Sequence, residues 1–234
     1  LFISQKQTSD IRGIDQSIRN AGDGISLAQT AEGALSQISS SVQRIREIAV
    51  QSSNATLEDR TGLQKEVDQL TQEISRIVQT TTFNGTSLFD VAGTSSLTFQ
   101  VGQDGNANNQ VSLTLSGLTG GLISAYASSL TATGTVDVSS AAAASATLST
   151  LETDLDDISK QRATFGAVQN RFESVISNLS NYSENLQASR SRIQDTDFAA
   201  ETANLTKAQI LQQAGTSILA QANTLPQNAL SLLR

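Results

Sequence analysis

Residues 11–49 read IRGIDQSIRNAGDGISLAQTAEGALSQISSSVQRIREIA, and apolar side chains recur in this stretch every three or four positions. The series runs Ile11, Ile14, Ile18, Ala21, Ile25, Ala28, Ala31, Leu35, Ile38, Val42, Ile45 and Ala49. Such spacing is typical of a helix that packs lengthwise in a supercoil, and the single slip near Ala28 overwinds the supercoil locally without ending the helix. We therefore predict one long helix over residues 3–53.

Two further helices follow from the same spacing. A shorter one is predicted over residues 57–80, with Thr56 as its N-cap and Glu58 and Asp59 in its first turn. Its seam is Leu63, Val67, Leu70, Ile74 and Ile77. A second long helix is predicted over residues 143–193, where steps of three and four continue from Leu148 to Ile193. The chain contains a single proline, the strongest interrupter of helices, so the sequence permits helices of this length.

Between the helices the apolar period changes from about 3.5 residues to two. Leu97, Phe99 and Val101 alternate with polar residues, and Val111, Leu113 and Leu115 do the same after a polar stretch. This pattern predicts a β-hairpin over residues 96–116, followed by a short variable surface insertion over residues 117–142. The predicted fold class is mainly α: a long antiparallel helical rod, like a coiled-coil bundle, with a small β-hairpin region.

The C-terminal stretch carries an apolar stripe that the other predicted helices leave without a partner. It consists of Leu205, Ala208, Leu211, Ala214, Ile218, Ala222 and Leu225. An uncovered stripe on a terminal helix indicates assembly with other chains.

The composition excludes several classes of function. The 234 residues carry a net charge of −7 and no His or Cys. Catalytic triads that use His, thiol nucleophiles, disulfides and thiolate zinc sites are therefore excluded, and an acidic chain disfavours nucleic acid and anionic membranes as partners. We predict a protein that is not an enzyme and has no cofactor or metal site.

Two clusters of oxygen ligands have ordinary structural interpretations. The stretch from Asp104 to Asn109 begins like a calcium loop, but Leu115 stands where a calcium-binding Glu is required, so we interpret it as a hairpin turn. The carboxylates of Glu152, Asp154, Asp156 and Asp157 lie in the early turns of a predicted helix, where a solvated acidic face is expected.

Several longer strings resemble bacterial flagellin, the subunit of the flagellar filament. They are NAGDGISLAQTAEGAL at 20–35, QRIREIAVQS at 43–52, SRSRIQD at 189–195, and KAQILQQAGTSILAQAN at 207–223 with LSLLR at 230–234. The resemblance covers residues 1–115 and 147–234. The family's usual N-terminal segment is absent before Leu1, and the central insertion is short, so the chain resembles an N-terminally truncated flagellin.

The resemblance implies a division into an outer core domain, 1–194, and the C-terminal half of an inner core domain, 195–234. It also implies a structural subunit that is secreted through the flagellum's type III export apparatus and polymerises into the extracellular filament for motility. The implied partners are other flagellin subunits and the flagellin-specific export chaperone. The implied polymerisation or chaperone-binding residues are Leu205, Leu211, Ala214, Ile218, Ala222, Leu225, Leu232 and Leu233. The alternative is a flagellin-like surface adhesin or carbohydrate-binding module.

The same resemblance implies recognition by the flagellin-sensing Toll-like receptor of innate immunity. The matching residues are Arg44, Ile48 and Gln51, with Glu66 on the next helix. Arg44, Ile48 and Gln51 share one helical face, and we expect Arg44 and Ile48 at the border of the seam and Gln51 nearer to solvent. The structural alternative is that Arg44 only pairs with a carboxylate of a neighbouring helix.

Overall fold

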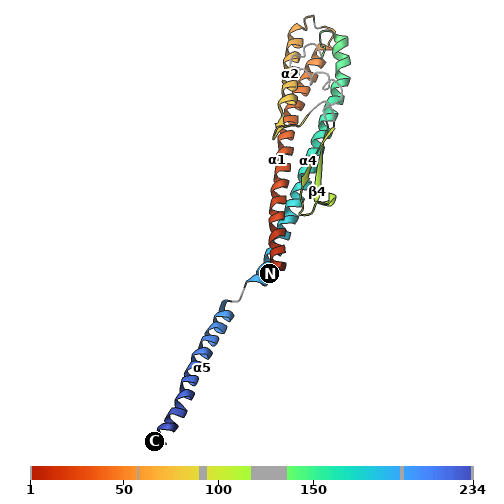
Figure 1. Cartoon of the computed structure of the whole chain (residues 1–234). Coiled ribbons are helices and arrows are strands. Elements are labelled where there is room, and N and C mark those ends of the chain that lie inside the picture. Colours follow the sequence, from red (N-terminus) through yellow and green to blue (C-terminus); the bar gives the residue numbers. More distant parts are fainter. Residues whose placement is uncertain (1, 57, 90–93, 117–135, 196–197, 233–234) are drawn as a thin grey trace. The chain divides into compact units, whose positions relative to one another are not determined.

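The computed structural model describes residues 2–56, 58–89, 94–116, 136–195 and 198–232. The chain divides into two compact units, one of residues 9–185 and the other of residues 1–8 with 186–234. The described elements are mainly helical, as predicted from the spacing of apolar residues (Figure 1). No helix among the described residues is both long and apolar enough to span a membrane.

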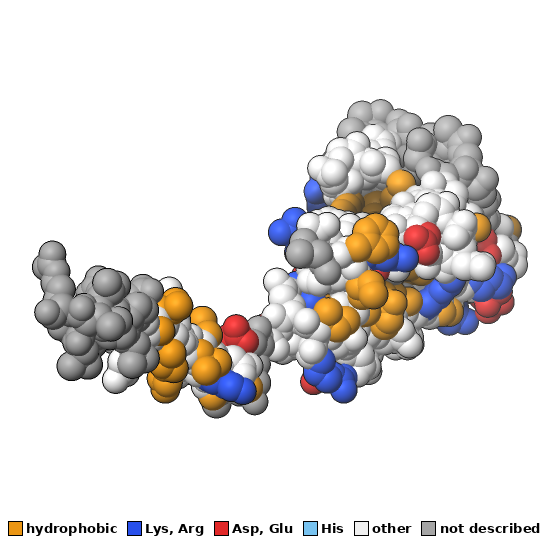
Figure 2. Space-filling model, turned by 60° about the horizontal axis from the view of Figure 1, so that its bottom comes forward, with side chains coloured by type: hydrophobic (Ala, Val, Ile, Leu, Met, Phe, Trp, Pro, Cys, Tyr) orange, Lys and Arg blue, Asp and Glu red, His pale blue; other side chains and the backbone are white. Residues whose placement is uncertain are grey.

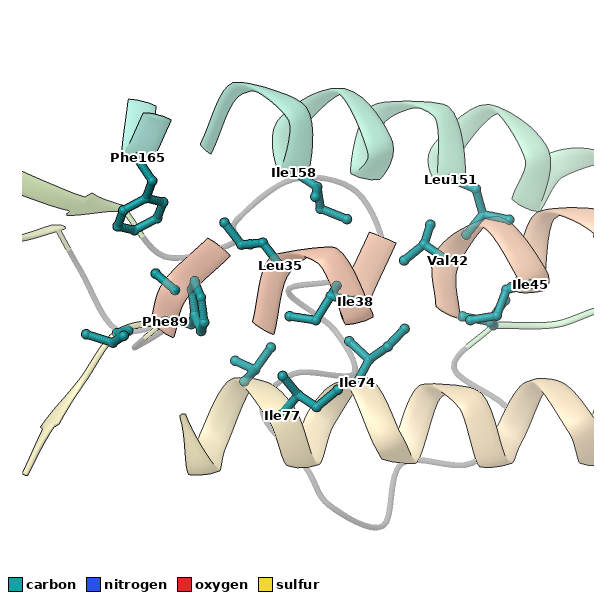
Figure 3. Close-up of a cluster of buried hydrophobic side chains, with 14 of the residues drawn as sticks. Leu35, Ile38, Val42, Ile45, Ile74, Ile77, Phe89, Leu151, Ile158 and Phe165 are labelled. Atoms are coloured by element: carbon teal, nitrogen blue, oxygen red, sulfur yellow. The ribbon is translucent and has the colours of Figure 1, made fainter. Parts of the chain in front are cut away.

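The two long helices are α1, Phe2–Ser52, and α4, Ala141–Gln194. Helix α1 continues through the slip near Ala28, which confirms that the slip does not end it. In the larger unit α1 packs with α4 and with the shorter α2, Thr61–Thr80, over one continuous apolar core (Figure 3). That core includes Leu35, Ile38, Val42, Ile45, Ile74, Ile158 and Phe165, all at most 1% exposed.

The turn between α1 and α2 differs from the prediction, because α2 begins at Thr61 rather than at residue 57. Thr56 is not its N-cap: the backbone N–H and the hydroxyl of Thr56 both donate to Asn54 Oδ1, at 3.2 and 3.0 Å. Arg60 donates to the carbonyl oxygens of Ser52 and Asn54, both at 2.9 Å, and so satisfies carbonyls at the end of α1. Asp59 Oδ1 accepts the N–H of Thr61 at 2.9 Å, and this hydrogen bond holds the pKa of the Asp59 carboxyl below its ordinary value.

The predicted hairpin is present, two residues longer at its start. Strand β3, Thr94–Gln100, pairs antiparallel with β4, Gln110–Ser116, with Leu97 opposite Leu113 and Phe99 opposite Val111. A one-turn helix, η1 (Ala107–Asn109), lies in the connecting loop. The calcium-like stretch is part of this loop, where Gln100 Nε2 and Asn109 Nδ2 both donate to the carbonyl of Asp104, at 2.7 and 3.2 Å.

A second, smaller hairpin was not predicted. Strands β1, Thr82–Phe83, and β2, Thr86–Ser87, pair antiparallel around Asn84 and Gly85. Both turn residues have positive φ, 49° and 79°, as a two-residue type I′ turn requires. The Asn-Gly pair is the sequence signal for this turn.

Helices α1 and α4 approach closely where the larger hairpin covers them. A Cβ on Gly24 of α1 would lie 2.5 Å from Phe172 Cζ of α4, so only glycine fits there without movement. The Phe172 ring is fully buried and meets Phe99 of β3 edge to face, with centroids 5.4 Å apart. Ala21, Val101 and Val111 complete this second apolar cluster.

The chain rejoins the bundle earlier than predicted. Val136 and Val138 are at most 1% exposed, and α4 already begins at Ala141, so the predicted insertion over 117–142 extends too far. Gln64 of α2 binds this segment twice, donating to Val136 O and accepting the N–H of Val138, both at 2.8 Å. Residues 117–135 lie outside the described residues.

The smaller unit contains the start of α1, the end of α4 and helix α5, Phe198–Leu232. The start of α1 and the end of α4 are joined by polar side chains. Ser4 donates to Gln194 at 3.1 Å, Gln7 donates to Ser189 at 3.2 Å, and Arg190 donates to Thr8 at 3.4 Å. The division into domains 1–194 and 195–234 remains a prediction, because compactness within one chain does not define the domains of an assembly.

Candidate functional site

Helix α5 presents apolar side chains to solvent. Leu205, Leu211 and Ile218 are 57%, 63% and 65% exposed, and Ala214 and Ala222 are also exposed. Figure 2 shows hydrophobic side chains at the surface along the described part of α5. Leu225, Leu232 and Leu233 lie outside the residues whose side chains are described. The described part of the predicted stripe is therefore available for contact with another chain.

The exposed apolar surface of α5 is broader than predicted. Ile210 and Leu219 are 62% and 64% exposed but do not belong to the predicted stripe. Ile210 directly precedes Leu211 in the sequence, and Leu219 directly follows Ile218. Because successive residues of a helix are about 100° apart, the two side chains widen the stripe on opposite sides. A hydrophobicity profile over all faces of the helix, rather than one heptad seam, identifies them.

Arg44 lies at the centre of an exposed ionic cluster on α1 and α2. Its Nε and Nη2 both lie 2.8 Å from Glu66 Oε1, and its Nη1 lies 3.0 Å from Glu47 Oε2. The three side chains are between 42% and 68% exposed. Hydrogen bonds to Glu47 and then to Glu66 raise the pKa of the Arg44 guanidinium. The cluster joins the two predicted residues Arg44 and Glu66, and adds Glu47, which sequence analysis did not include.

Of the other two predicted receptor residues, Gln51 is exposed and Ile48 is buried, at 1% exposure. The expectation that Ile48 lies at the border of the seam is wrong. At this level α1 packs on both α2 and α4, so its buried face is wider than a seam against a single helix and includes Ile48 with Ile45 and Ala49.

The acidic cluster on α4 is solvated only in part. Glu152 and Asp156 are exposed, but Asp154 is 0% exposed, so a solvated face is the wrong interpretation for this residue. Asp154 lies three residues after Leu151 and four before Ile158, and these two neighbours are fully buried. Its heptad position predicts burial, and the charge-based interpretation overlooked that position. Among the described residues, no group of three or more acidic side chains is arranged to hold a metal ion.

Two further ion pairs join α1 to α4. Arg162 of α4 lies 2.6 Å from Glu32 of α1, and Arg46 of α1 lies 3.3 Å from Glu152 of α4. All four side chains are at least one-third exposed, so each pair contributes at most about 1 kcal/mol. These contacts therefore add little to the stability of the α1–α4 packing.

Comparison with protein families gives matches at both ends of the chain. The model of the bacterial flagellin N-terminal helical region matches residues 1–94, and that of the C-terminal helical region matches residues 148–233. A flagellin of Halalkalibacterium halodurans is 44% identical, and a flagellin of Bacillus subtilis is 40% identical. Both alignments cover 100% of this chain, with 84% and 85% of the respective relatives.

Solved structures agree with this result. The crystal structure of Bacillus cereus flagellin is similar with a TM-score of 0.54 and 26% identity, over 69% of this chain and 88% of that one. A putative flagellar hook-associated protein from Vibrio parahaemolyticus has a TM-score of 0.64 over 81% of this chain and 95% of its own. At 15% identity, the latter shows a shared fold alone.

Proposed function

Because the chain belongs to the bacterial flagellin family, it is a structural subunit of the extracellular flagellar filament, and we propose that α5 supplies much of its binding energy for other subunits. The observation that carries this proposal is the exposure of Leu205, Leu211 and Ile218 on one helix. Burying a side chain of this size stabilises a complex by ~1.5–3 kcal/mol. Several such side chains on one helix provide a strong contribution to association.

Charged substitutions on α5 test this proposal. Leu211→Asp and Ile218→Asp should each reduce self-association of the purified chain at least tenfold, as measured by sedimentation, because the carboxylate cannot be buried without a partner. Gln212→Asp adds the same charge at an exposed polar position of α5 and is the matched control. Equal association of Leu211→Asp and Gln212→Asp would show that the apolar stripe is not the binding surface.

The flagellin-specific export chaperone is the second proposed partner of α5. An uncovered apolar helix exposes the chain to aggregation before assembly, and a chaperone that covers the stripe would prevent this. The predicted contacts are Leu205, Leu211, Ala214, Ile218, Ala222, Leu225, Leu232 and Leu233. Binding of the chaperone should be lost in Leu211→Asp and retained in Gln212→Asp.

We further propose that the cluster of Arg44, Glu47 and Glu66, with Gln51, is recognised by the flagellin-sensing Toll-like receptor. The observation that favours this function is an exposed guanidinium held in place by two carboxylates, since ordering a side chain before binding lowers the entropic cost of forming a complex. Ile48 contributes by packing the helix that carries the cluster rather than by contact, because it is buried.

Receptor binding by single-residue variants tests the second proposal. Arg44→Ala should weaken binding at least tenfold, about 1.4 kcal/mol. Arg76→Ala is the matched control, because Arg76 forms a similar exposed pair with Glu73 one turn away, on α2. Both variants should keep the helix content of the parent. If Arg44→Ala binds as tightly as Arg76→Ala, the cluster is not the recognition site.

A further inference from the structure

The turn between β1 and β2 holds a pair of residues that can react with each other. Asn84 and Gly85 form this turn, and nowhere else in the sequence does glycine directly follow asparagine. Both residues are exposed. Within the part of the chain that the structure describes, the side-chain amide of Asn84 has no hydrogen-bond partner. This amide is therefore held neither by burial nor by a polar contact.

The main-chain nitrogen of Gly85 is equally accessible. The β1–β2 ladder ends at the pair of Phe83 and Thr86, so the Gly85 N–H lies outside it. A Cβ on Gly85 would meet nothing within 4 Å, and glycine itself has no side chain that could block approach to its nitrogen. The ladder is only two residue pairs long, and so short a hairpin opens locally at low cost in free energy.

We propose that Asn84 is a site of spontaneous covalent modification, which loses its side-chain amide as ammonia and becomes aspartate or isoaspartate. The Gly85 nitrogen attacks Cγ of Asn84, so an N–Cγ bond forms and the Cγ–Nδ2 bond breaks. Nδ2 leaves as ammonia and takes up the proton that the Gly85 nitrogen loses, and a cyclic imide remains. Water then adds to one carbonyl of the imide, breaks its bond to the Gly85 nitrogen and restores the N–H.

Other asparagines lack this combination of features. The Asn20 side chain lies on α1 and donates to the carbonyl oxygen of Gln100 at 2.9 Å. Asn54 Oδ1 accepts two hydrogen bonds from Thr56. Asn106 is exposed in the loop between β3 and β4, but it is followed by Ala107, whose side chain hinders attack by the next nitrogen. Asn106 therefore serves as the internal reference for an exposed asparagine without a following glycine.

The two products differ in their effect on the hairpin. Aspartate adds a negative charge but keeps the main chain, and it tolerates the positive φ of 49° at this position. Isoaspartate routes the main chain through the side chain and so lengthens it by one carbon atom. A two-residue turn cannot absorb this extra atom and keep Thr82 opposite Ser87.

Loss of this register affects the core directly after the hairpin. The N–H of Leu88 donates to the carbonyl oxygen of Thr81 at 3.1 Å, across the base of the hairpin. Leu88 and Phe89 are both 1% exposed, and Phe89 lies in the apolar core of the larger unit (Figure 3). Isoaspartate at the exposed tip should therefore loosen the packing of the chain after α2.

Mass spectrometry of the aged full chain tests the site. The purified chain is incubated at mildly alkaline pH in water enriched in heavy oxygen, and its peptides are then separated and sequenced. Asn84 should lose its amide at least tenfold faster than Asn106, and each product molecule should carry heavy oxygen from hydrolysis of the imide. An isoaspartate-specific protein methyltransferase serves as the probe for the isoaspartate fraction. Equal rates at Asn84 and Asn106, or reaction at Asn84 only after unfolding in urea, would overturn the proposal.

Hydrogen–deuterium exchange tests the effect on the hairpin. Exchange at the Leu88 amide should be at least tenfold faster in the isoaspartate form than in the fresh chain. Freshly prepared Asn84→Asp is the matched control, because it carries the added charge on a main chain of normal length, and it should exchange like the parent. If the isoaspartate form exchanges at Leu88 no faster than Asn84→Asp, the proposed loss of register is wrong.

Discussion

Burial of individual residues in the helical bundle depends on the spacing of apolar positions and on the number of helices around each turn. The seam from Ile11 to Ala49 is apolar and its members are buried or half-buried, because the heptad spacing fixes which side of a helix meets its neighbours. The expected position of Ile48 at the border of the seam is wrong because burial also depends on how many helices surround a given turn. The sequence of one helix does not contain that number. The charge of Asp154 suggests exposure to solvent, whereas its spacing from Leu151 and Ile158 indicates the burial that is observed.

The close contact between Gly24 and Phe172 leads to a prediction with an internal control. Gly24→Ala should lower the free energy of unfolding by ~1–3 kcal/mol, because its Cβ would overlap a fully buried ring. Gly33→Ala should raise the stability of the dilute chain by ~0.5–1 kcal/mol, because that position is open and alanine favours helix. Thermal and urea unfolding of both variants, followed by circular dichroism, measures the two effects. Equal shifts in both variants would mean that α1 and α4 are farther apart at Gly24 than described.

At the scale of elements, the long helices and the larger hairpin could be predicted because each has a repeating apolar pattern. The ends of both long helices lie within two residues of their predicted positions, but the start of α2 does not, because it depends on individual hydrogen bonds. Helix α2 starts at Thr61 because Thr56 and Arg60 are engaged in closing the turn after α1. The β1–β2 hairpin is too short for a pattern of alternation and is identifiable only from Asn84-Gly85.

The side chain of Gln64 acts as the hydrogen-bonding partner of the segment that precedes α4. Gln64→Ala should destabilise the larger unit by ~1–3 kcal/mol, because the carbonyl of Val136 and the N–H of Val138 would both lose a partner in a buried environment. Amide exchange at Val138 should accelerate in the same variant. Gln69→Ala on the exposed side of α2 is the control and should change neither quantity. An unchanged exchange rate at Val138 in Gln64→Ala would contradict the described contact.

At the scale of the whole molecule, the two units differ in how their residues are buried. The core of the larger unit contains most of the buried apolar side chains, whereas none of the described side chains of α5 is buried. The sequence indicates this difference through an apolar stripe that no other helix matches. A heptad seam includes only one face of α5, so it leaves out Ile210 and Leu219, which widen the exposed apolar surface.

The two units should therefore differ in dynamics. In a dilute solution of the chain, amide exchange across residues 205–222 should be much faster than across residues 35–49, because a helix without tertiary contacts is only marginally stable in water. Hydrogen–deuterium exchange with mass spectrometry compares the two stretches in one sample. Exchange across α5 as slow as that of the core in the dilute monomer would show that α5 has a partner within the chain.

The segment between Ser116 and Val136 can change in length over evolutionary time at little cost in stability. Leu115 is 3% exposed and Val136 is 1% exposed, so the bundle holds the chain on both sides of that segment. When both ends are held, added length contributes mainly the entropy of closing a longer loop, and each doubling of length costs only ~0.6 kcal/mol. Mutations that lengthen this segment are therefore nearly neutral for stability, whereas a change of one methylene group among the buried side chains of the bundle is not. Lineages of this subunit should diverge in size at this point while the helices around it stay the same length.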